Sequence, residues 1–91
     1  GDLAGANFSH ANLSKISFEK SDLSGSNFSY SKLAKINFLE SKLNASTFRK
    51  AMMSACCLDE SVLLGVNFKH ANLDNTSFVR ADFRGVDLSN K

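Results

Sequence analysis

Every fifth residue of the chain is large and apolar, and polar residues fill most of the positions between. These apolar centres begin at Leu3 and continue in steps of five to Leu88, and all eighteen are Leu, Phe or Met. A small or β-branched residue stands two positions before the centre, as Ser26 does before Phe28. A period of five fits neither an α-helix nor a flat strand. The chain must therefore turn a corner every five residues, which predicts stacked coils of short straight segments around an apolar axis.

A second, longer period overlies the first. Leu and Phe alternate at most centres, so each residue type recurs every ten positions. If four segments make one coil, residue n lies under residue n+20, at roughly the 4.8 Å spacing of neighbouring strands. We therefore expect an all-β core in which two aromatic columns face each other between two aliphatic ones, with Leu58 as the exception in the second. The aromatic columns are Phe8, Phe28, Phe48 and Phe68, and Phe18, Phe38 and Phe78.

The same register aligns glycines at one corner of the coils. Gly5, Gly25, Gly65 and Gly85 fall in one column with Ala45. Glycine suits a turn whose third residue needs a positive φ, as in a type II turn. The chain contains no proline, which fits stacked segments whose N–H groups pair with the coils above and below.

The repeated units resemble a known family. Units such as ANFSH, ANLSK, SDLSG and SNFSY are similar to the A(D/N)LXX consensus of the pentapeptide-repeat family, and the similarity extends over the whole chain. The resemblance implies a right-handed quadrilateral β-helix of about four and a half coils, with the centre and the small residue two before it pointing inward. Met52, Cys57 and Val62 stand where the family usually has Asp or Asn, so we expect local irregularity there.

Composition and charge narrow the partner classes. The 91 residues suffice for one small domain, 1–91, and since the repeat runs from Asp2 to Leu88 we expect a piece excised from a longer chain. A formal charge of +2 is too balanced to indicate nucleic acid or a membrane surface. No signal peptide is evident. The adjacent Cys56 and Cys57 make no disulfide framework, which favours a reducing, cytoplasmic location, with a secreted effector as the alternative.

One outer face is mildly basic. In the family, residues just before and after each centre point outward. This places two histidines, one tyrosine and three cations along the face centred on residues 8, 28, 48, 68 and 88. The face is either an anion or phosphate site or an ordinary solvated surface. Its residues are His10, Tyr30, Arg49, Lys50, Lys69 and His70.

A group of outward apolar residues forms the second candidate site. It is centred on the irregular stretch 51–65 and extends to nearby coils. Clustered exposed apolar groups often mark a partner site, although single apolar residues are common on any surface. The residues are Leu39, Met52, Val62, Leu64 and Val79.

The sequence indicates neither a catalytic nor a metal site. His10 and His70 share a column but lie three coils apart, roughly 14 Å at the strand spacing, too far to share one ion. Cys56 takes an inward position, and Cys57 points outward without a histidine nearby. No acid and base are arranged around one serine. We therefore expect no enzyme activity, no metal and no cofactor.

Three functions fit these observations. We expect first a non-catalytic protein-binding or scaffold module, whose open coil ends are covered by an adjoining domain or by a second copy placed end to end. Some pentapeptide-repeat proteins resemble a DNA duplex and bind DNA gyrase, conferring quinolone resistance, but such mimicry requires a strongly acidic surface. The third alternative is a targeting or spacer domain of a larger bacterial effector or enzyme.

Overall fold

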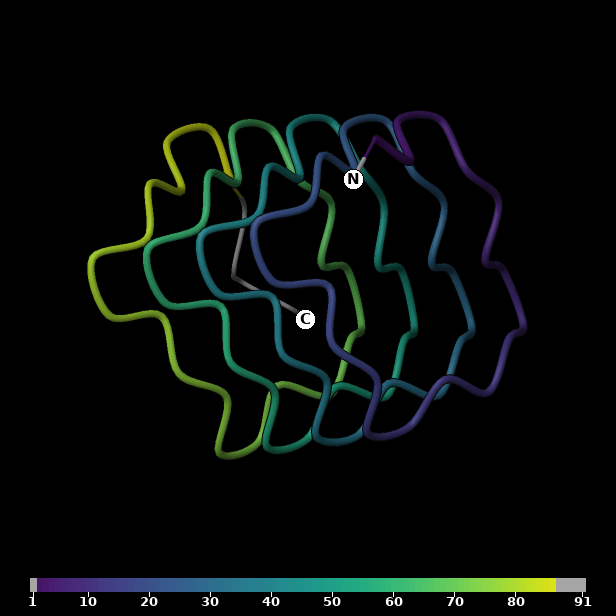
Figure 1. Cartoon of the computed structure of the whole chain (residues 1–91). Coiled ribbons are helices and arrows are strands. Elements are labelled where there is room, and N and C mark those ends of the chain that lie inside the picture. The colour runs from purple at the N-terminus through teal and green to yellow at the C-terminus, as the bar shows by residue number, and fades with distance from the viewer. Residues whose placement is uncertain (1, 87–91) are drawn as a thin grey trace.

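The chain winds into a right-handed, four-sided β-helix (Figure 1). The computed structural model describes residues 2–86. Within this range no helix forms, and each five-residue segment contributes a single bridge residue rather than an extended strand. Each bridge is parallel and joins residue n to residue n+20, from Asp2↔Asp22 to Val62↔Asp82. The predicted 20-residue coil is therefore confirmed.

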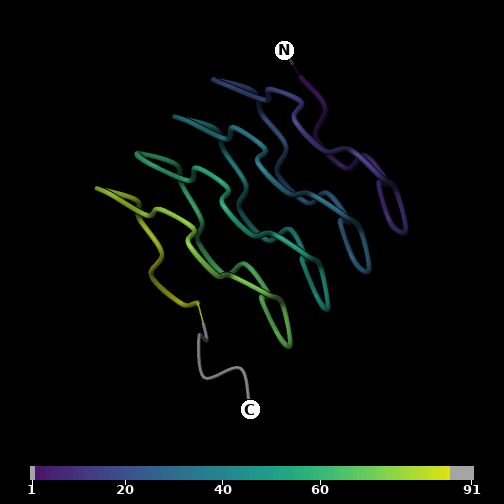
Figure 2. The same ribbon diagram turned by 90° about the horizontal axis from the view of Figure 1, so that it is seen from below.

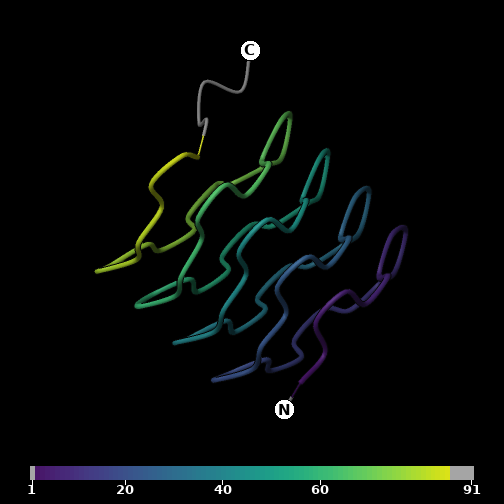
Figure 3. The same cartoon turned by 90° about the horizontal axis from the view of Figure 1, so that it is seen from above.

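The coils are joined by backbone hydrogen bonds that run in both axial directions. The N–H of the centre Leu3 donates to the carbonyl of Asp22 at 2.8 Å, and that of the corner Gly5 donates to Ser24 at 2.8 Å. In the opposite direction, Asn27 N–H donates to the carbonyl of Ala6 at 2.9 Å. The same three bonds recur around the coils. The coils therefore lie as nearly parallel layers, with the first and last described segments at opposite ends of the stack (Figures 2 and 3).

Phenylalanine rings fill the axis as two facing columns. Within one column Phe28 stacks on Phe8 at 5.0 Å and on Phe48 at 4.8 Å between ring centroids. Across the axis Phe28 meets Phe18 and Phe38 edge-on, at 6.1 Å and 5.9 Å. Such offset and edge-to-face pairs are the preferred aromatic geometries. The predicted aromatic columns are confirmed, and Leu58 occupies its place in the second column fully buried.

Every corner, not only the glycine corner, needs a left-handed residue. Positive φ occurs at Gly5, Gly25, Gly65 and Gly85, but also at thirteen non-glycine residues, among them Ala45 at 60°. Nearly all of these corners close with a hydrogen bond from the residue after the corner to the preceding centre, as in a type II turn. One example is the bond from Ala6 N–H to Leu3 O at 3.1 Å. The expectation of one special corner was therefore too narrow.

Where Asp or Asn stands before a centre, its side chain usually caps the turn that follows. Asn7 Oδ1 accepts a hydrogen bond from the N–H of Ser9 at 3.0 Å, and Asn27 Oδ1 accepts one from Ser29 at 2.9 Å. Asn and Asp form such turns readily because their side chain reaches the backbone two residues on. The Asp or Asn side chain thus accepts a hydrogen bond from a backbone N–H that has no partner in the neighbouring coil.

The three departures from the repeat do not interrupt the register. Met52, Cys57 and Val62 bridge to Asn72, Ser77 and Asp82 respectively, as the neighbouring coils do. The irregularity expected at these positions is absent from the backbone pairing of the described residues, since the bridges depend on backbone groups and not on the side chain.

Candidate functional site

The basic face carries a ladder of rings and cations at its corner. Its residues lie on the segments 6–10, 26–30, 46–50 and 66–70. The His10 ring stacks on Tyr30 at 5.0 Å with an interplanar angle of 6°. Lys50 Nζ lies 5.6 Å from the centroid of the same tyrosine ring, within the range of a cation–π contact. The structure therefore brings three of the six predicted residues into direct contact.

The left-handed corner explains this alignment. His10, Tyr30, Lys50 and His70 have φ values of 62°, 61°, 58° and 61°, so their side chains leave the backbone at equivalent points of successive coils. All four side chains are exposed. The sequence indicated that they share a column, but it gave no sign of the left-handed backbone that projects them.

The charged residues on the described segments of the basic face are all cations. Arg49, Lys50 and Lys69 are exposed on two successive coils, and none of the four described segments of this face contains Asp or Glu. The 2.9 Å hydrogen bond from Lys50 N–H to the Lys69 carbonyl holds these two coils together. The face thus has the largest unbalanced charge among the described residues.

The opposite side of the helix, centred on residues 18, 38, 58 and 78, is mixed and more acidic. Here Asp59 Oδ1 accepts hydrogen bonds from the hydroxyl of Ser77 and from Val79 N–H, the latter at 3.0 Å. The bond from Ser77 is the main cause of a pKa of Asp59 below its usual value, because it favours the carboxylate. This carboxylate therefore joins two coils and is less available to a partner.

The five residues of the predicted apolar patch do not form one surface. Met52 bridges to Lys32 and Asn72, whereas Val62 bridges to Lys42 and Asp82 half a coil away, on the opposite side of the helix. Leu39 and Val79 lie on the side between, centred on residues 38 and 78, and are separated by the coil of Asp59. The prediction of a single cluster was wrong geometrically, because residues ten apart in the sequence point in opposite directions.

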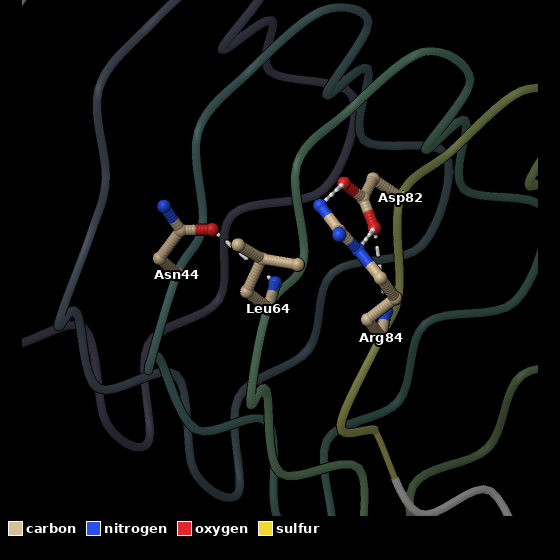
Figure 4. A network of polar contacts seen from close by, with 4 residues as sticks. All are labelled: Asn44, Leu64, Asp82 and Arg84. Atoms are coloured by element: carbon tan, nitrogen blue, oxygen red, sulfur yellow. Dashed lines mark hydrogen bonds and ion pairs between the residues drawn. The ribbon is translucent and has the colours of Figure 1, made fainter.

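Val62 and Leu64 alone lie together, on either side of the buried Leu63. Both are half-buried, whereas Met52 and Val79 are exposed. Leu64 N–H donates to Asn44 Oδ1 of the preceding coil at 3.2 Å, beside the ion pair between Asp82 and Arg84 (Figure 4).

Asn44 and Asp59 accept backbone hydrogen bonds from the next coil, a structural role that the sequence analysis did not identify. Where Val62 and Ser77 replace the usual Asp or Asn, the N–H two residues on is left without its local acceptor. Asn44 supplies an acceptor for Leu64, and Asp59 supplies one for Val79, each from the preceding coil. A polar residue twenty positions before an unsatisfied N–H is the signal that could have identified both.

The cysteines occupy different environments. Cys56 is buried and its Sγ donates a hydrogen bond to the Leu33 carbonyl at 2.8 Å. Burial raises the pKa of the Cys56 thiol to about 11, since desolvation disfavours the thiolate. Cys57 is half-buried on the side centred on residue 58. Within residues 2–86, no three His, Cys, Asp or Glu side chains are grouped to hold a metal ion. The same residues contain no helix of the length and apolarity needed to cross a bilayer.

Two family models match the chain. A model described as a pentapeptide repeat region matches residues 1–68, and one described as pentapeptide repeats (8 copies) matches residues 58–90. The two matches together extend over nearly the whole chain. A comparison with curated proteins finds no match.

The chain is similar to several solved structures, and the likeness to the first of those described here supports the fold. The chain is similar to QnrB1, a plasmid-mediated fluoroquinolone resistance protein, with a TM-score of 0.72 and 22% identity over 96% of this chain and 42% of that one. A pentapeptide-repeat protein of the Arabidopsis thaliana thylakoid lumen gives a TM-score of 0.48 and 28% identity over 98% of this chain and 66% of its own. HetL from the cyanobacterium Nostoc gives 0.42 and 18% over 98% and 56%. The chain thus spans less than half of QnrB1 and about two thirds of the plant protein.

Proposed function

We propose that this chain, which belongs to the pentapeptide-repeat family, acts as a non-catalytic protein-binding or scaffold module. The observation that carries the proposal is that apolar side chains fill the axis of the helix while the backbone holds the outer side chains in fixed positions. Phe28, Phe38 and Phe48 are fully buried and pack ring against ring, so side chains occupy the interior. The polar groups are displayed outside, on sides that the coil-to-coil hydrogen bonds hold in place.

Such an exterior suits recognition of a macromolecule. Side chains at equivalent positions of successive coils are separated by the coil spacing, as the 5.0 Å between the rings of His10 and Tyr30 shows. Their backbone is already ordered, which lowers the entropy lost on binding. A partner would therefore meet a preorganised array rather than a flexible loop.

Capture by variants of single faces tests this function. The immobilised chain and four variants are each exposed to a cell lysate, and the proteins that they retain are compared. Each variant carries two charge reversals or two apolar-to-glutamate changes on one face. We expect a reproducible partner that is lost with one variant and kept with the other three. Retention that is insensitive to all four variants, or no specific retention, would contradict the proposal.

DNA mimicry with gyrase binding is the second candidate. Its supporting observation is the fold shared with QnrB1, a fluoroquinolone resistance protein. Against it stand a net charge of +2 and a basic face with three cations on the segments 46–50 and 66–70, since a mimic of DNA needs an acidic surface. We expect the purified chain to leave gyrase supercoiling unaffected. Inhibition at stoichiometric concentration would promote this candidate over the first.

A targeting or spacer role within a larger bacterial protein is the third candidate. Two residues at core positions of the terminal coils are exposed, Leu3 by 41% and Phe83 by 43%, whereas Leu23 and Leu63 of the same column are fully buried. An adjoining domain or a second copy placed end to end would cover them. Light scattering separates these cases, because a dimer doubles the mass whereas an adjoining domain leaves this chain monomeric.

A further inference from the structure

We propose that the basic face binds an acidic, carboxylate-rich segment of a protein partner, an inference that rests on the proposed protein-binding function. The face presents Arg49, Lys50 and Lys69 without any acidic side chain on its described segments. Charge complementarity of this kind speeds encounter and selects against basic partners. The remainder of the surface mixes both signs, so this face is where a negative segment would be attracted most strongly.

The cations are close enough to act together. Arg49 and Lys69 occupy equivalent positions on successive coils, which places their backbones about 4.8 Å apart. Lys50 stands at the corner itself, and its Nζ lies 5.6 Å from the centroid of the Tyr30 ring, which is itself stacked on His10. An extended peptide advances about 3.3 Å per residue. Alternate side chains of such a peptide lie on one face, about 6.6 Å apart, so three alternate glutamates could reach all three cations at once.

The ring geometry favours an acidic peptide over a nucleic acid. Proteins that bind single strands stack the bases on open aromatic faces. Here the Tyr30 ring is already stacked on His10, and Lys50 Nζ lies 5.6 Å from its centroid, so a stacking base would have to displace existing contacts. Three cations could neutralise only about three phosphates, which gives weak and strongly salt-dependent binding to a polyphosphate chain.

A second copy of this chain is a poorer occupant. Its acidic side carries Glu40, Asp59 and Glu60, but Lys20 and Arg80 stand at the two ends of the same corner column. Asp59 is also engaged by Ser77 and Val79. Docking that side against the basic face would bring cations together, whereas a glutamate-rich segment has no such conflict.

Fluorescence anisotropy with a labelled octaglutamate peptide tests the inference, at pH 7.5 and about 0.1 M salt, where charges more than about 10 Å away are largely screened. One variant combines Arg49→Glu, Lys50→Glu and Lys69→Glu. The control carries the same change of charge on the neighbouring face, as Lys15→Glu, Lys32→Glu and Lys35→Glu. We expect the first variant to bind at least about tenfold more weakly than the unmodified chain, and the control to stay within about threefold. Circular dichroism verifies that both fold.

Several results would overturn the inference. These are no binding of octaglutamate by the unmodified chain, equal losses in both variants, or tighter binding of a single-stranded oligothymidine than of the peptide. Concentration-dependent self-association that the basic-face variant abolishes, without peptide binding, would instead assign the face to a second copy. If lysate capture depends on a different face and octaglutamate does not bind, the proposed function stands and only this inference falls.

Discussion

A side chain's contribution to this fold depends on whether it points into the axis or out of it, and neighbouring residues can differ completely. Phe28 is fully buried and touches four other phenylalanine rings. Tyr30, two residues on, is 43% exposed and contacts its corner neighbours, the ring of His10 and the ammonium of Lys50. A comparison of these two aromatic residues therefore isolates how much an inward rather than an outward side chain contributes to stability.

Phe28→Ala should lower the free energy of unfolding by about 3–5 kcal/mol, the range found when a buried aromatic site is emptied. Tyr30→Ala should cost about 1 kcal/mol or less, because it removes only a surface stack and an exposed cation–π contact. Urea denaturation followed by circular dichroism measures both. Equal losses would contradict the assignment of inward and outward positions.

The buried serines provide a second comparison between like residues. Ser61 Oγ donates to the Leu58 carbonyl at 2.6 Å, whereas Ser41 Oγ, equally buried one coil earlier, is the one buried side-chain oxygen or nitrogen in residues 2–86 without a partner. Removing a satisfied hydroxyl loses a hydrogen bond, and removing an unsatisfied one relieves a desolvation cost.

We therefore expect Ser41→Ala to leave the free energy of unfolding unchanged or to raise it by about 1 kcal/mol, and Ser61→Ala to lower it by about 1 kcal/mol. The difference between the two variants follows from the hydrogen bond alone, because both changes remove the same atom at matched positions. Denaturant midpoints of the two variants, measured together, decide the matter. A comparable loss in both would show that Ser41 has a partner when the protein is in solution.

At the scale of the coil, backbone strain recurs at the corners. Seventeen corners have a positive φ, four at glycine and thirteen at other residues. A left-handed backbone costs an L-residue about 1–2 kcal/mol in conformational energy. Glycine avoids this strain but loses more conformational entropy when the chain folds. The coil-to-coil ladder and the buried axis must outweigh this strain at each turn.

Exchanging residues within the glycine corner measures that strain. A Cβ added at Gly65 would have nothing within 4 Å, so only its φ of 69° opposes an alanine there. We expect Gly65→Ala to lower the free energy of unfolding by about 0.5–1 kcal/mol, the difference between backbone strain and the unfolded-state gain. Ala45→Gly, at φ 60° in the same column, should raise it by a similar amount. Thermal unfolding of both variants tests this, and matching signs would refute it.

A carboxylate that joins two coils should make stability depend on pH. Hydrogen bonds, chiefly from Ser77, lower the pKa of Asp59 below its ordinary value of 3.8. A lowered folded-state pKa gives stability that is present above the unfolded-state value and is lost as the pH falls through the folded-state value. The thermal midpoint should therefore drop as the pH falls below about 4. Asp59→Asn should drop less over the same range, and an identical drop in both proteins would exclude this contribution.

The periodicity of the sequence was enough to predict the coil, its 20-residue repeat and the aromatic columns, because each rests on the spacing of side chains alone. The corners were only partly predictable. Lys20 and Glu40 adopt a positive φ although neither residue type favours it, since closure of the coil imposes it. The prediction of one apolar patch was wrong because Met52 and Val62, though close in sequence, lie on opposite sides of the helix. The acceptors that Asn44 and Asp59 provide depend on contacts between coils.

For the whole molecule, stability is a sum over stacked coils and their interfaces, as in other solenoids. Because each residue pairs with those twenty positions away, one whole coil can be removed without changing the register of the rest. Deletion of residues 41–60 joins Glu40 to Ser61, which returns Asp22 to a position below Val62 and Phe38 below Phe78. Deletion of residues 41–45 instead rotates all later segments by one side and places Phe48 over Leu23.

We expect the 41–60 deletion to retain the β-rich circular dichroism spectrum and to unfold cooperatively, at a lower midpoint because one interface is lost. The 41–45 deletion removes a quarter as many residues but mismatches all four columns at one interface, so its midpoint should be lower still. Denaturant titration of the two deletions beside the full chain gives the order. A 41–60 deletion that is unfolded, or that is less stable than the 41–45 deletion, would show that the coils do not contribute as interchangeable units.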